Sequence, residues 1–283
     1  MELLIILITN DKKYSIGAIV QLLCCTLFGF SSMVLAELKP QWELGVGVGS
    51  IIQPDYLGAD ESSSYTTLYP FGIYRQPKYS IDRNGVNGSL LEVGNFGVGL
   101  SFGAQLPVDS DDNQTRRGMP DLEPQLEFGP NMHYLLSERG SSSVKIELPV
   151  RMSISVRNGD YEGVTANPRL VWRFKSAAWK NNISIGSVFS EQRYSQRIYS
   201  VEQPFERVGR NRFAAKGGYS GSKLSFAGSR RYDNVLVAAF FSYSNLDGAV
   251  NKRSPLLKRR HNYSAGVAIT WLFKESSKLV DSI

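Results

Sequence analysis

The histidines, and the hydroxyl and carboxylate residues near them, are the groups that could support nucleophilic chemistry. The 283-residue chain has two histidines, His133 and His261. If Glu127 and His133 shared one strand face and Ser153 or Ser155 lay on the next strand, an acid, a base and a hydroxyl could meet. There is no G-x-S-x-G motif and no fixed spacing, so a histidine in a polar network is the favoured interpretation. We therefore expect no catalytic residues.

The metal and thiol chemistry is equally sparse. Two separated histidines without a carboxylate pair nearby give no metal-ligand pattern. Cys24 and Cys25 lie in a segment that we expect to be removed, which excludes disulfides and cysteine catalysis from the mature chain. We expect no cofactor and no bound metal.

The N-terminal segment predicts secretion. Lys12 and Lys13 precede the apolar run 16–30, which is short for a membrane span and is followed by small residues up to Ala36. We predict a signal peptide over residues 1–36. An N-terminal membrane anchor is the alternative.

Period-two alternation recurs along the rest of the chain. Successive side chains of a strand point to opposite faces, so alternation of apolar with small or polar residues predicts strands with one apolar face. The last such stretch, 263–273, has the length that a tilted strand needs to cross a membrane. Its apolar face carries Tyr263, Ala265, Val267, Ile269, Trp271 and Phe273.

The faces opposite the apolar ones carry charge in the middle of the strands. A soluble β-sandwich also alternates, but long strands, internal charges and the closing aromatic girdle of Trp271 and Phe273 favour a membrane barrel with a polar lumen. We predict an all-β fold, an antiparallel transmembrane β-barrel over residues 37–273 in the Gram-negative outer membrane. The predicted lumen network comprises Glu123, Glu127, Lys145, Glu147, Arg151, Arg169 and Arg173.

Loop lengths predict the number of strands. Both ends of such a barrel lie in the periplasm, so the count is even, with short turns inside and long loops outside. A hairpin at Asn84-Gly85 brings the alternation into phase and gives about twelve strands, and ten is the second choice. The expected outer loops are 107–120, 157–163, 194–211 and 247–261, and the expected turns include 138–142, 176–181 and 231–234.

The lumen charges leave two interpretations open, a cross-linked closed interior or a water-filled pore. Pairing of 143–157 with 163–176 around their loop would place Glu147 near Arg173 and Arg151 near Arg169. Such a network favours a closed barrel.

Positive charge gathers in two expected outer loops. The net charge is +6 but is spread along the chain, and a secreted protein has little occasion to bind nucleic acid. Guanidinium groups suit phosphates, so we expect contact with outer-membrane lipid, including lipopolysaccharide, and ordinary solvated loops are the alternative. The residues are Arg207, Arg210, Arg212, Lys252, Arg253, Lys258, Arg259 and Arg260.

The order of several local signals resembles the MipA/OmpV family of outer-membrane proteins, whose namesake is the MltA-interacting protein. They are the early loop 54–60 (PDYLGAD), Leu68-Tyr69-Pro70, the segment 117–122 (RGMPDL), Asn245 to Ala249 (NLDGA) and the final Trp271-Leu272-Phe273. The sequence departs from the family in Ala59, where serine is usual, and in the residues Lys274 to Ile283 after the terminal phenylalanine.

The resemblance implies a non-enzymatic scaffold that links a lytic murein transglycosylase to a penicillin-binding protein. It supplies no binding residues to carry over. The C-terminal periplasmic tail, 274–283, is the candidate contact segment, and a disordered tail is the favoured interpretation. A small-solute channel, a surface or adhesion barrel and, third, an outer-membrane hydrolase are the rival functions.

Overall fold

The computed structural model describes residues 38–76, 79–82, 85–88 and 90–281. The predicted signal peptide, residues 1–36, lies outside the described residues. Within the described part of the chain, no helix has the length and apolar character to cross a membrane.

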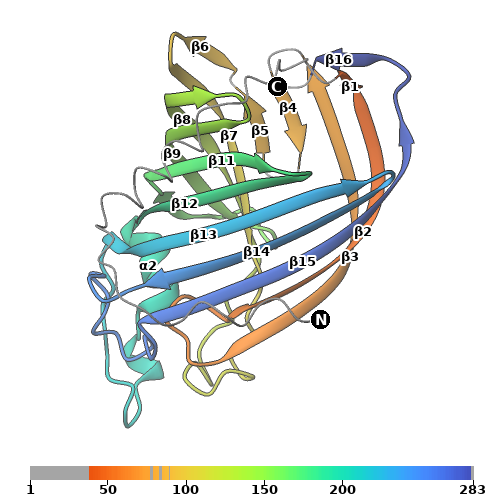
Figure 1. Ribbon diagram of the computed structural model, residues 1–283. Coiled ribbons are helices and arrows are strands. Elements are labelled where there is room, and N and C mark those ends of the chain that lie inside the picture. The colour runs from red at the N-terminus through yellow and green to blue at the C-terminus, as the bar shows by residue number, and fades with distance from the viewer. Residues whose placement is uncertain (1–37, 77–78, 83–84, 89, 282–283) are drawn as a thin grey trace, which may run out of the picture. The chain divides into compact units, whose positions relative to one another are not determined.

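Long antiparallel strands follow one another around a strongly curved sheet (Figure 1). Neighbours in the chain are neighbours in the sheet, as in an up-and-down barrel. The long strands are β2 (Trp42–Pro54), β3 (Ser62–Gln76), β7 (Phe96–Gln105), β8 (Gln125–Arg139), β9 (Ser142–Ser155), β12 (Trp179–Ser190), β13 (Gly218–Tyr232), β14 (Val235–Asn245) and β15 (His261–Glu275). The short ones are β4 (Tyr79–Asp82), β5 (Gly85–Gly88), β6 (Leu91–Val93), β10 (Tyr161–Ala166) and β11 (Arg169–Ser176).

The pairings confirm the predicted antiparallel barrel of about twelve strands. The sheet has 14 strands, but β6 lies off its path, and β10 and β11 are one strand interrupted at Asn167-Pro168, because proline cannot donate to the ladder. Twelve positions remain, with β15 paired to β2 and β12 to β13. The join of β5 to β7 is a single pair, Gly85 with Ser101, so the sheet is not fully closed there.

The predicted hairpin after β4 is present. Asp82 pairs with Gly85, so Gly85 belongs to β5 and not to the turn, and Asn84 lies outside the described residues. β4 and β5 are much shorter than the long strands, which explains why β5 pairs with β7 at one position only.

The outer wall of the sheet is apolar. On β15, Tyr263, Val267, Ile269, Trp271 and Phe273 are each more than half exposed. An apolar band of this kind is costly in water, so the outer face of the sheet suits lipid. The Trp271 and Phe273 rings lie 5.8 Å apart near the end of the strand and form the aromatic girdle there.

The inner wall at β2 is packed by aromatic side chains. A Cβ at Gly47 would lie 2.5 Å from the ring of Tyr69 on β3, so glycine is what lets this ring lie flat against the wall. The Tyr69 hydroxyl reaches Thr270 Oγ1 on β15 at 2.8 Å. Tyr69 therefore bridges β3 and β15 across β2.

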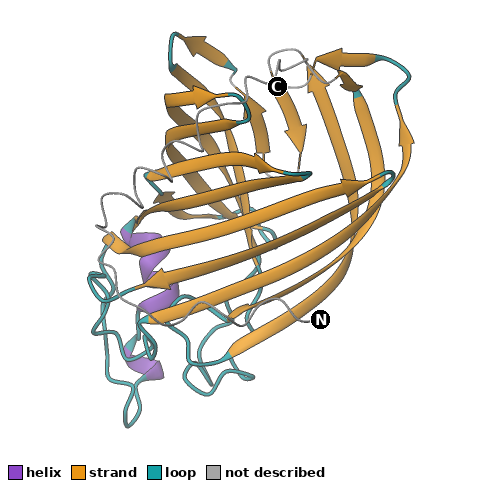
Figure 2. Ribbon diagram, in the orientation of Figure 1, coloured by secondary structure: helices purple, strands orange, loops and turns teal. Residues whose placement is uncertain are grey.

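The two ends of the sheet differ, as the loop lengths predict. The helix and the long connections gather at one end, and the short turns lie at the other (Figure 2). At the short-turn end, β1 (Leu38–Pro40) pairs with β16 (Leu279–Asp281), which joins the two terminal segments. β15 itself continues past Phe273 to Glu275. Much of the predicted tail 274–283 is thus β-structure in the described residues.

Candidate functional site

Four long connections pack against one another at one end of the barrel. They are 55–61, 106–124, 191–217 and 246–260, and we call them together the loop cap. Their apolar side chains form one buried cluster, although each contributes only a few. The cluster comprises Tyr56, Ala59, Val108, Leu122, Ile198, Tyr199, Val201, Ala215, Leu246, Ala249, Leu256 and Leu257.

The third connection contains the helix α2 (Gln192–Tyr199) and the 3-10 turn η1 (Gln203–Phe205). Tyr194 and Ile198 are four residues apart, so they share one helix face, and both pack against the apolar cluster. The sequence analysis missed this helix. The spacing of these two apolar residues was the available signal.

Two tyrosines tie the cap connections together. The Tyr56 hydroxyl donates to the carbonyl of Leu256 at 2.8 Å, and the Tyr199 hydroxyl donates to the carbonyl of Leu57 at 2.8 Å. Burial raises the pKa of both tyrosines, so they remain neutral donors at physiological pH. Connections far apart in the sequence are thereby fixed to one another.

Arg116 lies at the centre of the loop cap and is 2% exposed. Its guanidinium donates to the carbonyl of Ile198 at 3.1 Å, to the carbonyl of Pro120 at 2.9 Å and to Ser110 Oγ at 3.2 Å. It also lies 5.7 Å from the centroid of the Tyr56 ring. Burial lowers the pKa of Arg116 to about 10, so it stays charged at neutral pH and its donors remain available.

The basic loop residues predicted to contact lipopolysaccharide divide into two groups. Arg210 is buried and donates to the carbonyls of Phe205 at 2.9 Å, Thr115 at 3.0 Å and Arg117 at 3.0 Å. Burial, reinforced by Arg207, lowers the pKa of Arg210. Arg210 is therefore a bridge inside the loop cap. The exposed residues of the set are Arg207, Arg212, Lys252, Arg253, Lys258, Arg259 and Arg260, and for these the lipid contact stays a prediction.

Helix α2 connects the loop cap to the lumen wall. The Tyr194 hydroxyl lies against Gln105 at the end of β7 and 3.4 Å from Glu127 Oε1 on β8. Arg197 donates to the Glu123 carbonyl at 2.5 Å and to Gln105 Oε1 at 3.2 Å. These contacts hold the helix across the ends of the strands.

The structure brings the predicted lumen charges together around two carboxylates. Glu147 is 2% exposed and lies 2.7 Å from both Arg169 and Arg173. Glu127 lies 3.5 Å from Arg151.

The strand register differs from the one assumed in the sequence analysis. Arg169 pairs directly with Glu147, and Arg151 pairs with Thr165. The side chain of Arg151 therefore reaches toward β7, where its Nε donates to Ser101 Oγ at 2.7 Å. Lys145 lies two residues before Glu147 on β9 and so shares its face.

Glu123 does not belong to the middle of the lumen. β8 begins two residues later, at Gln125, so Glu123 lies in the loop cap, where its carboxylate meets Arg157 at 3.1 Å. The expectation that the strand alternation extends to Glu123 is wrong because Pro124 interrupts the ladder.

A second ion-pair cluster, which the sequence analysis missed, lies near the short turns. Glu43 is fully buried between Arg75 at 2.5 Å and Arg231, and Arg231 also reaches Glu275 at 3.3 Å. Glu43 lies two residues before Gly45, so it shares the inward face of β2 with Gly45, Gly47 and Gly49. This position in the alternation was the available signal.

The residues considered for hydrolysis do not assemble. Ser153 pairs with Glu127 and lies 3.4 Å from its carboxylate. His133 is six residues further along β8, about 20 Å away at the rise of a strand. Its partner in the register is Glu147. The other histidine, His261, contacts the Tyr243 hydroxyl at 2.7 Å.

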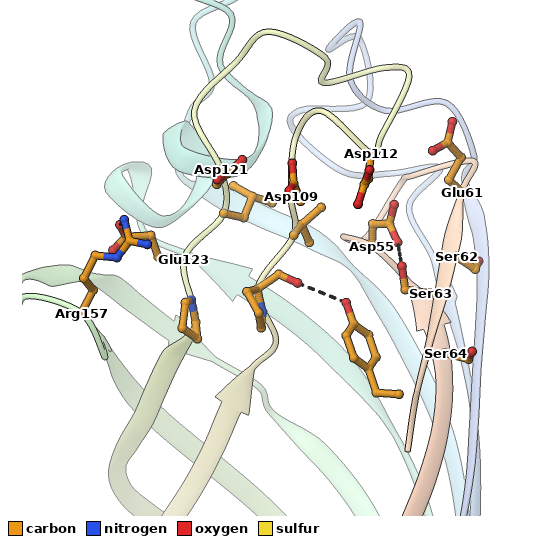
Figure 3. Close-up of a pocket in the computed structure, with 15 residues that line it drawn as sticks. Asp55, Glu61, Ser62, Ser63, Ser64, Asp109, Asp112, Asp121, Glu123 and Arg157 are labelled. Carbon is orange, nitrogen blue, oxygen red and sulfur yellow. Dashed lines mark hydrogen bonds and ion pairs between the residues drawn. The ribbon is translucent and has the colours of Figure 1, made fainter. Parts of the chain in front are cut away.

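A cavity of about 540 Å³ lies where the loop cap meets β3. Figure 3 shows the acidic residues Asp55, Glu61, Asp109, Asp112, Asp121 and Glu123 around it, with Arg157 at one side. Asp55 accepts from Ser63 Oγ at 2.6 Å and from Asn113 Nδ2 at 2.7 Å. Through these two hydrogen bonds, the carboxylate of Asp55 holds the connection 106–124 to β3. The described residues contain no cluster of three or more histidine, cysteine or carboxylate groups placed to hold a metal.

Several solved structures similar to this one are outer-membrane proteins. An outer membrane channel from Pseudomonas putida F1 has a TM-score of 0.43 and 10% identity, over 87% of this chain and 100% of its own. The outer membrane protease OmpT from Escherichia coli has 0.31 and 11%, over 86% and 100%. The NanC porin has 0.33 and 7%, over 83% and 99%. Likeness this remote carries no argument about function.

The sequence comparisons are more decisive. Among curated proteins, no sequence matches the chain. The sequence model of the protein family described as MltA-interacting protein MipA, by contrast, matches residues 46–273. These residues span the sheet from β2 to β15 together with the loop cap. The chain belongs to the MipA family.

Proposed function

We propose that this protein is a non-enzymatic outer-membrane barrel with a non-conducting lumen, which anchors periplasmic murein-processing proteins. The observation that carries the proposal is the loop cap, because a buried apolar cluster lies at the end opposite to the short turns. The cap belongs on the outer side, since barrels of this class have short periplasmic turns and long external loops.

Several contacts support a barrel that does not conduct. An ion pore needs a continuous path of water or polar ligands. We propose that the apolar cluster interrupts that path. In support, α2 is tied to Gln105 and Glu127, and Glu147 is cross-linked to two arginines. A channel is the weaker candidate.

The periplasmic surface supports an anchoring role. The short turns alone are small, and a stable interface buries roughly 800 Å² on each partner. The paired segments β1 and β16 add to that surface, with Leu38 and Leu279 more than half exposed. The family description names interaction with MltA, and we propose that a lytic transglycosylase and a penicillin-binding synthase are the partners of this chain.

Capture from an envelope extract tests the proposal. After mild cross-linking, we expect the full chain to retain an MltA-type enzyme, because the paired termini and the turns present a joint surface. Lys258→Glu, on the opposite end, is the matched control and should capture equally. Recovery of no murein enzyme, even after cross-linking, would contradict the anchoring role.

A further inference from the structure

A row across the lumen wall places two cations beside a position without a side chain. Arg169 on β11 pairs with Gly186 on β12, and Gly186 pairs with Lys223 on β13. A Cβ at Gly186 would lie 2.5 Å from the Cβ of Arg169, so glycine is required here. No side chain separates Arg169 from Lys223 along this row.

The cations around this row outnumber the carboxylates. They are Arg151, Arg169, Arg173 and Lys223, against Glu127 and Glu147. Glu147 is shared by Arg169 and Arg173. Glu127 is taken by Arg151 and by Gln105, whose Nε2 donates to it at 2.8 Å. Both carboxylates are therefore already engaged.

Of these four cations, Lys223 is the one without an ion-pair partner. Among the described residues, no carboxylate lies within ion-pair distance of its ammonium group. The charged groups that act on it are Arg169 and Arg151, which repel it, and Glu127, which attracts it. Two like charges and one carboxylate that already pairs with Arg151 therefore act on Lys223.

The surroundings of Lys223 suit an anion. Ser184 and Ser225 pair with each other two residues along from Gly186 and Lys223, so they share the inward face, and Ser244 pairs with Lys223 itself. Hydroxyl groups of this kind donate to oxyanions. The side chain of Arg169 keeps 27% of its surface exposed, so water reaches this wall.

We propose that the lumen binds a small oxyanion, of the phosphate type, between Lys223 and Arg169. Arg169 donates to Glu147 from Nε and Nη2, so its Nη1 is available to a second acceptor. Lys223 supplies a compact positive charge. Because the loop cap covers the outer end, the anion enters from the short-turn end. The site is independent of the proposed anchoring function.

Calorimetric titration of the purified full chain with inorganic phosphate, at constant ionic strength in chloride, tests this site. We expect saturable binding that Lys223→Met weakens at least tenfold, which corresponds to about 1.4 kcal/mol. Lys223→Arg should retain binding. Lys216→Met, which removes an exposed lysine of the loop cap outside the predicted lipid contacts, is the matched control and should bind as the wild type does.

Thermal unfolding gives a second readout that does not depend on the titration. Without phosphate, Lys223→Met should melt no lower than the wild type, because it removes a repelled charge. Phosphate should raise the melting temperature of the wild type and leave that of Lys223→Met unchanged. Absence of saturable binding to the wild type, equal binding by Lys223→Met, or a lower melting temperature of the phosphate-free variant would each overturn the site.

Discussion

Replacement of Arg116 by alanine is expected to unfold the loop cap while the strands stay assembled. The change removes the donors to the Ile198 and Pro120 carbonyls and to the Ser110 hydroxyl, all inside the cap. Leaving buried acceptors unsatisfied costs about 1–3 kcal/mol for each group, so we expect a loss of about 3 kcal/mol or more in cap stability. The strand ladders do not include Arg116 and should be unaffected.

Protease treatment of intact cells measures this effect. The wild-type loops should resist cleavage, and those of Arg116→Ala should be cut, while heat-modifiable migration of the barrel stays the same in both. Arg117→Ala is the matched control, since Arg117 is exposed and donates to the carbonyl of Asp111 alone, at 3.2 Å. If Arg116→Ala were as resistant as Arg117→Ala, Arg116 would not hold the cap together.

Glu147→Gln is expected to destabilise the barrel itself. The change leaves Arg169 and Arg173 facing each other without their shared carboxylate. Breaking a buried ion pair from one side costs about 3–5 kcal/mol. The two arginine side chains are 27% and 39% exposed, so water screens part of the repulsion and about 2 kcal/mol is the expected loss.

Urea unfolding of the barrel, refolded in detergent, measures this loss. Glu162→Gln is the matched control, because its carboxylate meets Arg197 only at 4.0 Å, and it should lose less than about 1 kcal/mol. The double change of Glu147→Gln with Arg173→Met should recover part of the stability. Equal free energies of unfolding for Glu147→Gln and Glu162→Gln would show that the ion pairs of Glu147 do not stabilise the barrel.

The strands were predictable because their signal is local. The alternation in 263–273 sets the faces of β15, and the same argument identifies Glu147 and Arg169 as inward residues. Register is not local. The predicted contact of Glu147 with Arg173 is present, but Arg169 also contacts Glu147, and Arg151, which was expected near Arg169, contacts Ser101 and Glu127.

The loop cap was not predictable by the same means. Its apolar residues are scattered through connections that look polar, and Tyr56, Val108, Ile198 and Leu256 meet only in the folded chain. A helix of one or two turns such as α2 is marginal on its own and is stabilised by tertiary packing. The basic loops suggested lipid contact for Arg210 for the same reason, since nothing local reveals that it is buried.

Planar-bilayer recording tests the central claim, that the loop cap closes the barrel. The purified wild type should insert without unitary conductance steps, because the apolar cluster interrupts any path for ions. A variant in which residues 191–217 are replaced by a short glycine-serine linker loses α2 and with it the contacts to Gln105 and Glu127, and should conduct. Conductance steps of the wild type as large and as frequent as those of the linker variant would contradict the account.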